Sequence, residues 1–564
     1  ISQRGLARVV GAIMLATLIV AGGCAALPRS GPVQLGQAGT GQEIPYPQAV
    51  AAPPARDANP AQIVEGFLQA MLAGNTDDFK VARSYLTEEA AAVWNPLVST
   101  TIYQSGEAPS LSEAAPDRMM ASFNQVGLVD ETGRYSVQTA RAEHRTMDLS
   151  QDEESQWRIA ALPDGIIIPQ DVFRGDYVAT RIYFPSADGQ FLVPDQRVFA
   201  RGGAATAAVK QFLAGPPPYL SGAVGAVVPP GTRLMTDTVK VSGSVATVNL
   251  SNAIARASET ARATVLACLK ASLMALPVIE SVQLQAESVP LEVNSAAGLE
   301  VDPKAVEGPF YLGDGGVWRV REGTAELITG TEAAANWESL TVDHSLGRLA
   351  GLEAESIAVI EKAGEVAVQW ALPEGLGAIS AAPVFDRLGW LWVAAGDVIV
   401  VFSAEGEPAE VNASGLDGRQ ITALAPARDG SRLALAVQSA DGAAELLVAG
   451  VTRGERSAPT RLTDPLAAGR VGASLTSLTW ADDVALAFLA VPTGDDEPAP
   501  AVLTVGGDVT FLKSPTDPPA AVAAGLGITQ IYASGRSGGL FGYSPRGRIW
   551  ASLASGTRAV VLAP

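Results

Sequence analysis

The C-terminal half of the chain contains an internal repeat, and this repeat restricts the fold more than any other feature. From about residue 299 to 564, helical patterns disappear and short β-like runs alternate with Gly and Asp turns. One unit, an apolar strand, an Asp turn and a second apolar strand, recurs around Asp343, Asp386, Asp429 and Asp482, at spacings of 43, 43 and 53 residues. A period of about 40–45 residues is typical of four-stranded propeller blades. Residues 299–564 are therefore predicted to form an all-β propeller of about six blades.

The first and last copies of this repeat are degenerate. We place them around Gly315–Trp318 and Pro545–Trp550. Strands from both ends of a propeller commonly share one blade, so weak terminal copies are expected.

Two smaller domains precede the repeat. Residues 59–176 begin with an Asn59–Pro60 helix start, a Gln62 capping partner and apolar residues at helical spacing up to a stop at Gly74–Asn75. Helices followed by strands predict an α+β domain that looks like the cone-shaped NTF2-like group. Residues 177–298 alternate strands and helices, including a hairpin with its turn at Ser242–Gly243, and predict a compact α/β unit. Because no long linker follows residue 177, we expect a fixed junction between the second and third domains.

The N-terminal residues 1–23 have the pattern of a signal peptide. Arg4 and Arg8 precede an apolar run from Val9 to Val20, and small residues then lead to Cys24. The pattern resembles a bacterial lipobox, although Ala21 stands where Leu or Val is usual. We expect Cys24 to be the lipid attachment site; the alternative is an ordinary secretory signal cleaved near Ala21. Diacylation would supply the two acyl chains that stable anchoring requires, and residues 24–58, rich in Pro, Gly and Ala, would form a flexible tether.

Charge and cysteine content exclude several functions. The formal net charge is −20, so nucleic acid and anionic lipid headgroups would be repelled, and we predict no nucleic-acid partner. The chain has two cysteines. If Cys24 carries lipid, Cys268 has no disulfide partner, and its helical surroundings predict a core position.

No catalytic, cofactor-binding or metal site is predicted. The two histidines, His144 and His344, are interpreted as a solvated residue and a turn residue, and no nucleotide-binding loop is present. The sequence Gly535–Gly539 matches G-x-S-x-G, but both histidines precede Ser537, so we interpret it as a blade turn. The repeat aspartates are expected to cap their own turns, and the acidic run Asp495–Glu497 is expected to be a solvated loop.

The order of these parts resembles the LpqB family of actinobacterial lipoproteins, and the middle domain is similar to the GerMN domain. The segments that carry the second resemblance are Ile182–Phe184, Leu192–Pro194 with Arg197, Phe212–Pro216, Val228–Thr232 and Val248–Ser251. The resemblance implies an accessory lipoprotein on the outer face of the cell membrane that acts on the extracellular domain of an MtrB-like sensor histidine kinase, in signalling tied to cell-wall growth and division. It offers no catalytic residue.

These observations favour a non-enzymatic, membrane-anchored regulator without a cofactor. The alternative is an envelope lipoprotein that binds a small molecule or a cell-wall glycan or peptide, in the cone of the first domain or at the central face of the propeller. A hydrolase that uses two carboxylates is a third hypothesis, weakened by the absence of a paired acid motif.

Overall fold

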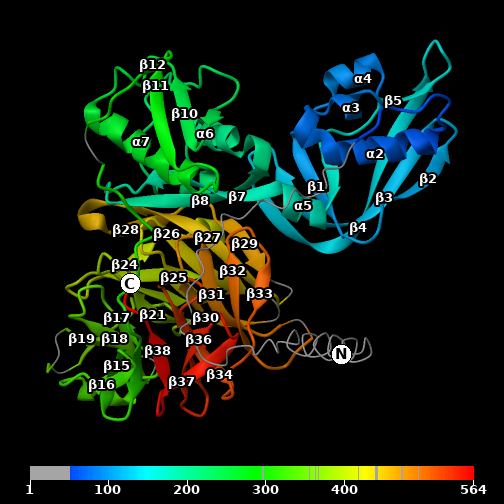
Figure 1. Ribbon diagram of the computed structural model, residues 1–564. Helices are drawn as coiled ribbons and strands as arrows, with labels where there is room; N and C mark the ends of the chain where they lie inside the picture. The colour runs from blue at the N-terminus through cyan, green and yellow to red at the C-terminus, as the bar shows by residue number, and fades with distance from the viewer. Residues whose placement is uncertain are drawn as a thin grey trace, which may run out of the picture. The chain divides into compact units, whose positions relative to one another are not determined.

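The computed structural model describes residues 51–564 except 295, 296, 355, 362, 363, 366, 417, 439–441, 472, 473 and 493 (Figure 1). All of them belong to one compact unit, Ala49–Pro564. Residues 1–50, with Cys24, the signal segment and most of the predicted tether, lie outside the described residues. Within the described residues, no helix is both long enough and apolar enough to cross a membrane.

The first domain packs three helices against one sheet. The helices are α2 (Pro60–Asp77), α3 (Lys80–Arg83) and α4 (Glu88–Val93), and α5 (Gln170–Asp176) leads out of the domain. The strands are β1 (Ser99–Tyr103), β2 (Ser110–Ala115), β3 (Arg118–Asp130), β4 (Tyr135–Gln151), β5 (Trp157–Ala161) and β6 (Ile166–Pro169), in the order β5-β4-β3-β1-β6 with β2 on β3. The core contains Phe67, Trp94 and Ile159. This is the predicted NTF2-like α+β architecture.

Helix α2 begins as the sequence predicts. Asn59 accepts a hydrogen bond from the Gln62 backbone N–H, and the Gln62 side chain accepts one from the Asn59 N–H, which forms a capping box. The predicted stop at Gly74–Asn75 is wrong, because the helix continues to Asp77. It ends where Asp78 adopts a left-handed conformation (φ 58°) and donates its N–H to the Gly74 carbonyl.

The second domain has two small sheets and two helices. One sheet contains β7 (Tyr177–Pro185), β8 (Phe191–Ala200) and β13 (Glu300–Val301). The other contains β9 (Lys240–Ser242), β10 (Val245–Leu250), β11 (Ser281–Ala286) and β12 (Val289–Pro290). Helices α6 (Ala204–Ala214) and α7 (Glu259–Met274) pack on β7. Gly243 takes φ 61° in the turn between β9 and β10, where the hairpin was predicted.

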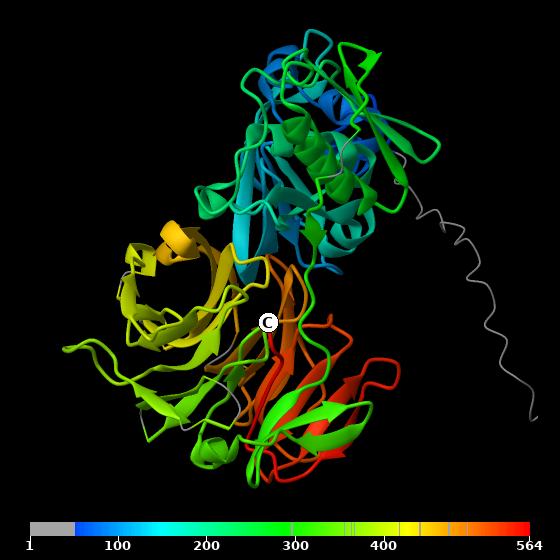
Figure 2. The same ribbon diagram turned by 90° about the vertical axis from the view of Figure 1, so that its left-hand side faces the viewer.

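The third domain is a six-bladed propeller. Its sheets follow one another around a common centre, from green through yellow and orange to red in Figure 2. Blade one contains β38 (Ala559–Val561), β14 (Phe310–Gly313), β15 (Gly316–Arg321) and β16 (Thr324–Leu327); blade two contains β17 (Thr341–Val342), β18 (Leu349–Glu353), β19 (Ser356–Ile360) and β20 (Val368–Trp370); blade three contains β21 (Ala381–Phe385), β22 (Leu391–Ala395), β23 (Val398–Phe402) and β24 (Pro408–Val411). Blade four contains β25 (Gln420–Pro426), β26 (Arg432–Gln438), β27 (Ala444–Arg453), β28 (Pro459–Leu462) and β29 (Leu466–Arg470); blade five contains β30 (Leu475–Trp480), β31 (Ala485–Ala490), β32 (Ala499–Thr504) and β33 (Val509–Phe511); blade six contains β34 (Pro519–Ala524), β35 (Ile531–Gly535), β36 (Leu540–Ser544) and β37 (Ile549–Ala554).

The first strand of each blade lies on the inside of the ring. Strand β21 contacts β17 and β25, β30 contacts β25 and β34, and β34 contacts β38. Strand β38, from the C-terminal end, pairs antiparallel with β14, with Phe310 opposite Val561. The two ends of the region therefore share blade one, as predicted.

In the other blades, the repeat falls on the turn between the first and the second strand. The two degenerate copies fall on other turns. Gly315 lies in the turn between β14 and β15, and Pro545–Arg548 lies between β36 and β37. In blade one the first and second strands come from opposite ends of the region, so no turn can connect them there.

Candidate functional site

The predicted chemistry-bearing segments have structural roles. Ser537 lies in a tight turn between β35 and β36, and its N–H, like that of Gly539, donates a hydrogen bond to the Asp517 carboxylate at 2.9–3.1 Å. No helix follows this serine, although a nucleophile elbow requires one. Gly535–Gly539 is a blade turn, as the sequence predicts.

The repeat aspartates cap their turns. Asp386 is fully buried; its carboxylate accepts hydrogen bonds from the backbone N–H groups of Leu388 and Trp390 and from the Trp392 indole, all at 2.9–3.0 Å. Asp343 and Asp482 accept equivalent backbone hydrogen bonds. These contacts confirm the predicted capping role.

The remaining singled-out residues are dispersed. His144 is exposed on β4 and hydrogen-bonds Ser122, while His344 lies in a turn next to the Pro564 carbonyl. Cys268 is fully buried in α7, and burial raises the pKa of its thiol to about 12. Asp495–Glu497 is exposed. Within the described ranges, no group of three or more His, Cys, Asp or Glu side chains is placed to hold a metal ion.

Several buried charged and polar side chains meet where the second domain packs on the propeller. Arg432 and Asp429 form an ion pair whose side chains are each 3% exposed. The Arg432 guanidinium also lies 4.6 Å from the Trp480 ring centroid and donates hydrogen bonds to the Asp483 carbonyl at 2.7 Å and, more weakly, to the Pro194 carbonyl at 3.5 Å. A propeller cation thus contacts the backbone of the second domain.

A second buried contact crosses the same junction. The Tyr183 hydroxyl on β7 donates to the Asp483 carboxylate at 2.8 Å, and Arg181 lies 3.1 Å from the other Asp483 oxygen. Burial raises the pKa of Asp483 above its ordinary value, and Arg181 partly opposes this shift. Burial also raises the pKa of Tyr183, so the phenol remains a hydrogen-bond donor at neutral pH.

Asp195 on β8 connects the second domain to the first. Its carboxylate, 1% exposed, is ion-paired with Arg197 at 2.5 Å and Arg134 at 3.5 Å, and it accepts a hydrogen bond from the Tyr219 hydroxyl at 3.1 Å. Arg197 in turn donates to the Thr132 carbonyl at 2.8 Å in the β3–β4 turn of the first domain. The Tyr219 carbonyl accepts a hydrogen bond from the Thr463 hydroxyl of the propeller at 2.6 Å.

These residues form what we call the junction cluster: Arg181, Tyr183, Asp195, Arg197, Tyr219, Asp429, Arg432 and Asp483. The apolar core is also continuous here, because one cluster of buried side chains includes Phe212 of the second domain and Trp480 of the propeller. Buried ion pairs whose partners are also hydrogen-bonded hold a specific geometry, because separating them leaves an uncompensated charge. The second domain and the propeller therefore make direct contacts through polar residues that the sequence analysis did not single out, and the fixed junction stays a prediction.

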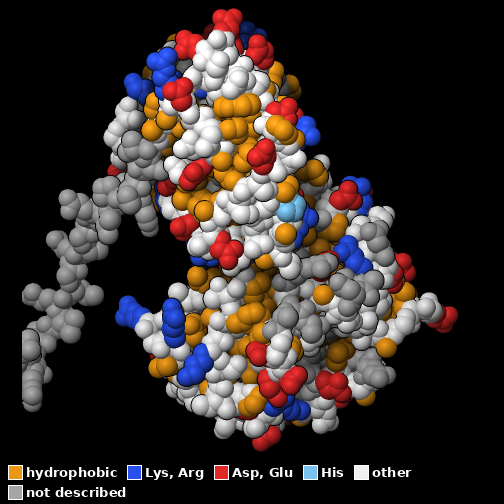
Figure 3. Space-filling view, turned by 90° about the vertical axis from the view of Figure 1, so that its right-hand side faces the viewer, with side chains coloured by type: hydrophobic (Ala, Val, Ile, Leu, Met, Phe, Trp, Pro, Cys, Tyr) orange, Lys and Arg blue, Asp and Glu red, His pale blue; other side chains and the backbone are white. Residues whose placement is uncertain are grey.

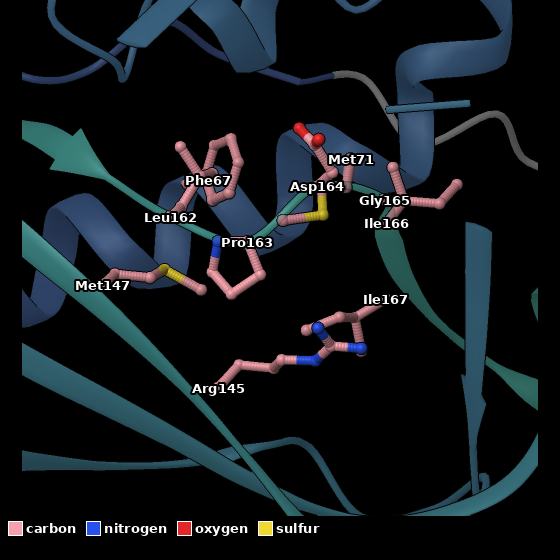
Figure 4. A pocket seen from close by; sticks show the side chains of 10 residues that line it. All are labelled: Phe67, Met71, Arg145, Met147, Leu162, Pro163, Asp164, Gly165, Ile166 and Ile167. Carbon is pink, nitrogen blue, oxygen red and sulfur yellow. The ribbon is translucent and has the colours of Figure 1, made fainter. Parts of the chain in front are cut away.

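The pocket beneath α2 in the first domain offers little space. The pocket beneath α2 has a volume of about 10 Å³, roughly the room for one water molecule. Phe67, Met71 and Met147 are among the residues that line it, and Figure 4 shows the Arg145 guanidinium and the Asp164 carboxylate at opposite sides. In this conformation the pocket does not accommodate the small ligand that one alternative hypothesis placed in the cone.

The surface shows no basic groove on the side seen in Figure 3, where acidic and basic side chains are interspersed. This mixed distribution on the viewed side is consistent with an acidic chain of net charge −20.

Taken together, the described residues define a multidomain architecture: an NTF2-like domain, a small α/β domain and a six-bladed propeller. The domains are joined by contacts such as the Arg134–Asp195 ion pair and the hydrogen bond from Tyr183 to Asp483. Three family models match the chain in this order. They are the "Lipoprotein LpqB, N-terminal domain" over residues 53–174, "Sporulation and spore germination" (Germane) over 181–292 and the "Lipoprotein LpqB beta-propeller domain" over 315–562.

Several relatives named Lipoprotein LpqB match over most of their length. The chain is 26% identical to that of Streptomyces coelicolor, covering 86% of each chain. It is 27% identical to that of Thermobifida fusca, covering 90% of this chain and 93% of the relative, and 25% identical to that of Mycobacterium tuberculosis, covering 84% and 85%. The chain belongs to the LpqB lipoprotein family.

Proposed function

We propose that this lipoprotein is a non-enzymatic regulator, anchored through Cys24 to the outer face of the cell membrane, that binds the extracellular part of an MtrB-like sensor histidine kinase. The chemistry of the N-terminal segment supports the anchor, because small residues precede Cys24 and an apolar run precedes them. In the predicted tether of residues 24–58, Ala52 and Asp57 are already hydrogen-bonded to the first domain, so the flexible part would end before them. That part would confine the folded body near the membrane and raise its effective concentration around a membrane partner.

The observation that carries the regulatory proposal is the junction cluster. It joins the second domain to the propeller through the buried hydrogen bond from Tyr183 to Asp483, and it reaches the first domain through Arg197, which donates to the Thr132 carbonyl. The faces of the joined domains would form one preorganised surface. Binding to such a surface costs less ordering entropy than binding to domains that move independently. A regulator must also bind one kinase state better than the other, and a surface of fixed shape can make that distinction.

In-cell crosslinking followed by mass spectrometry tests the proposal. The wild-type lipoprotein is expected to capture a sensor kinase, and a Cys24→Ala variant is expected to lose most of that capture because it loses the anchor. An Arg432→Ala variant, with lipid intact, should also capture less kinase, whereas Arg321→Ala, an exposed arginine on β15, should behave as wild type. Equal capture by wild type and Cys24→Ala would refute the anchoring step, and the absence of any kinase would refute the regulatory function.

A further inference from the structure

A hollow of about 390 Å³ opens at one end of the propeller, between blades three, four and five. This volume lies in the range of small-molecule sites, about 300–1,000 Å³. The polar side chains that line it are Ser380, Thr422, Gln438, Ser474 and Thr476.

The topology places this hollow at the end of the propeller opposite the junction cluster. Ser380 and Ser474 lie just before the inner strands β21 and β30, Thr422 is the third residue of the inner strand β25, and Gln438 is the last residue of β26. The Asp turns follow the other ends of these inner strands, and Asp429 and Arg432 in one of them pack on the second domain. The end that holds the pocket is therefore not the one used to join the domains.

The lining is uncharged. Three of its polar side chains, those of Gln438, Ser474 and Thr476, are exposed, and no hydrogen bond joins them to other described residues. The Ser380 hydroxyl is already engaged, because it accepts a hydrogen bond from the Gly396 N–H at 3.0 Å. Next to the lining residue Ala444, Glu445 forms an ion pair with Arg419 at 3.2 Å, so its charge is compensated.

Small apolar side chains complete the wall. Ala382, Val437, Ala444 and Leu475 lie between the polar groups. No aromatic side chain is among the lining residues, so a ligand would pack against methyl groups rather than a ring.

We propose that this pocket binds a neutral saccharide. An ionised ligand would lose hydration without gaining a charged partner, which disfavours acids and amines. Hydroxyl groups both donate and accept hydrogen bonds, so the serine and threonine side chains match sugar hydroxyls in either direction. The alanine, valine and leucine side chains suit the C–H faces of a sugar ring. The site is independent of the kinase-binding proposal and uses different residues.

Titration calorimetry of the full-length lipoprotein in detergent micelles tests the proposal, with N,N′-diacetylchitobiose, trehalose and maltose as neutral probes. At least one should bind, and chitobiose, which lacks the acetyl groups and carries amines, should bind more weakly than its acetylated form. The double variant Ser474→Ala/Thr476→Val should weaken the best probe by about tenfold, from the loss of two hydrogen bonds. Ala382→Phe, which fills the pocket, should abolish binding.

Thr510→Val is the matched control, because this threonine is exposed on the outer strand β33, and it should leave the affinity unchanged. Thermal unfolding of each variant establishes that it is folded. If none of the three neutral probes binds, or if binding survives all pocket variants, the proposal is wrong. Kinase capture by the pocket variants should equal that of wild type, so failure here and failure of the regulatory function are distinguishable.

Discussion

Replacing Arg432 by alanine should destabilise the propeller more than any exposed arginine substitution. The change leaves the Asp429 carboxylate, 3% exposed, without its cation and removes the guanidinium from the Trp480 ring. It also removes the hydrogen bond to the Asp483 carbonyl at 2.7 Å. Removing one partner of a buried ion pair costs about 3–5 kcal/mol.

For a domain of 150–250 residues, each kcal/mol shifts the melting temperature by about 2–4 °C. The propeller transition of Arg432→Ala should therefore fall by about 6–20 °C in differential scanning calorimetry of the full chain. Arg321→Ala serves as the control and should change the transition by less than about 2 °C, because its side chain is exposed.

A second variant separates lost charge compensation from lost packing. In Asp429→Asn/Arg432→Met, the asparagine retains an oxygen that can accept the hydrogen bond from the Ser431 N–H, 2.8 Å long in the wild type. Both charges of this ion pair are then absent. Replacing a buried ion pair by neutral groups is often nearly neutral, so the double variant should recover much of the stability. If Arg432→Ala melts like the control, or if the double variant is no better than the single one, the role assigned to this ion pair is refuted.

Three further predictions concern protonation, thiols and capping. The pKa of Asp483 is raised in the folded state above its ordinary value of 3.8, so the native protein binds the proton of this carboxyl more readily than the unfolded chain does. The contribution of Asp483 to stability should therefore fall as the pH rises above 3.8 and through the raised pKa. The unfolding free energy of wild type minus that of Asp483→Asn should decrease as the pH rises from about 3.5 to about 7. A difference that does not change with pH would contradict this prediction. The lipidated protein should show one reactive thiol, Cys268, only after denaturation, because this thiol is fully buried; a second thiol would indicate that Cys24 is unmodified. Asn59→Ala should cost the first domain about 1 kcal/mol through loss of the N-cap, measured by urea unfolding, whereas Asn59→Asp should not.

The sequence predicts the architecture well because the spacing of apolar residues along the chain reflects which side chains are buried. Residues that alternate in a strand, such as those of β11, bury every second side chain, and the repeat around Asp386 encodes an entire turn with its cap. The helix end at Asp77 was missed because Gly74–Asn75 has the composition of a stop signal while the left-handed residue that ends the helix is Asp78. A capping conformation depends on backbone geometry, which residue type determines only weakly.

The junction cluster could not be derived in the same way. Asp195 and Tyr219 are distant in sequence from Arg134, and their pairing depends on how two folded domains dock. The available signal was local: Asp195 and Arg197 stand within a strand that is otherwise largely apolar, a pattern that requires partners for two buried charges. The pocket at the propeller end is even less visible, because three separate blades contribute ordinary serine and threonine residues to it.

The pairing of β38 with β14 has a consequence for biogenesis. Phe310 and Val561 are about 250 residues apart along the chain, and a contact of this range forms late because the intervening chain must first be brought together. During synthesis, blade one lacks its inner strand until residues 559–561 have emerged. A chain interrupted before that point would present an open ring with an unpaired strand edge, which invites aggregation. The closed propeller therefore forms only from chains that extend through its last strand, β38.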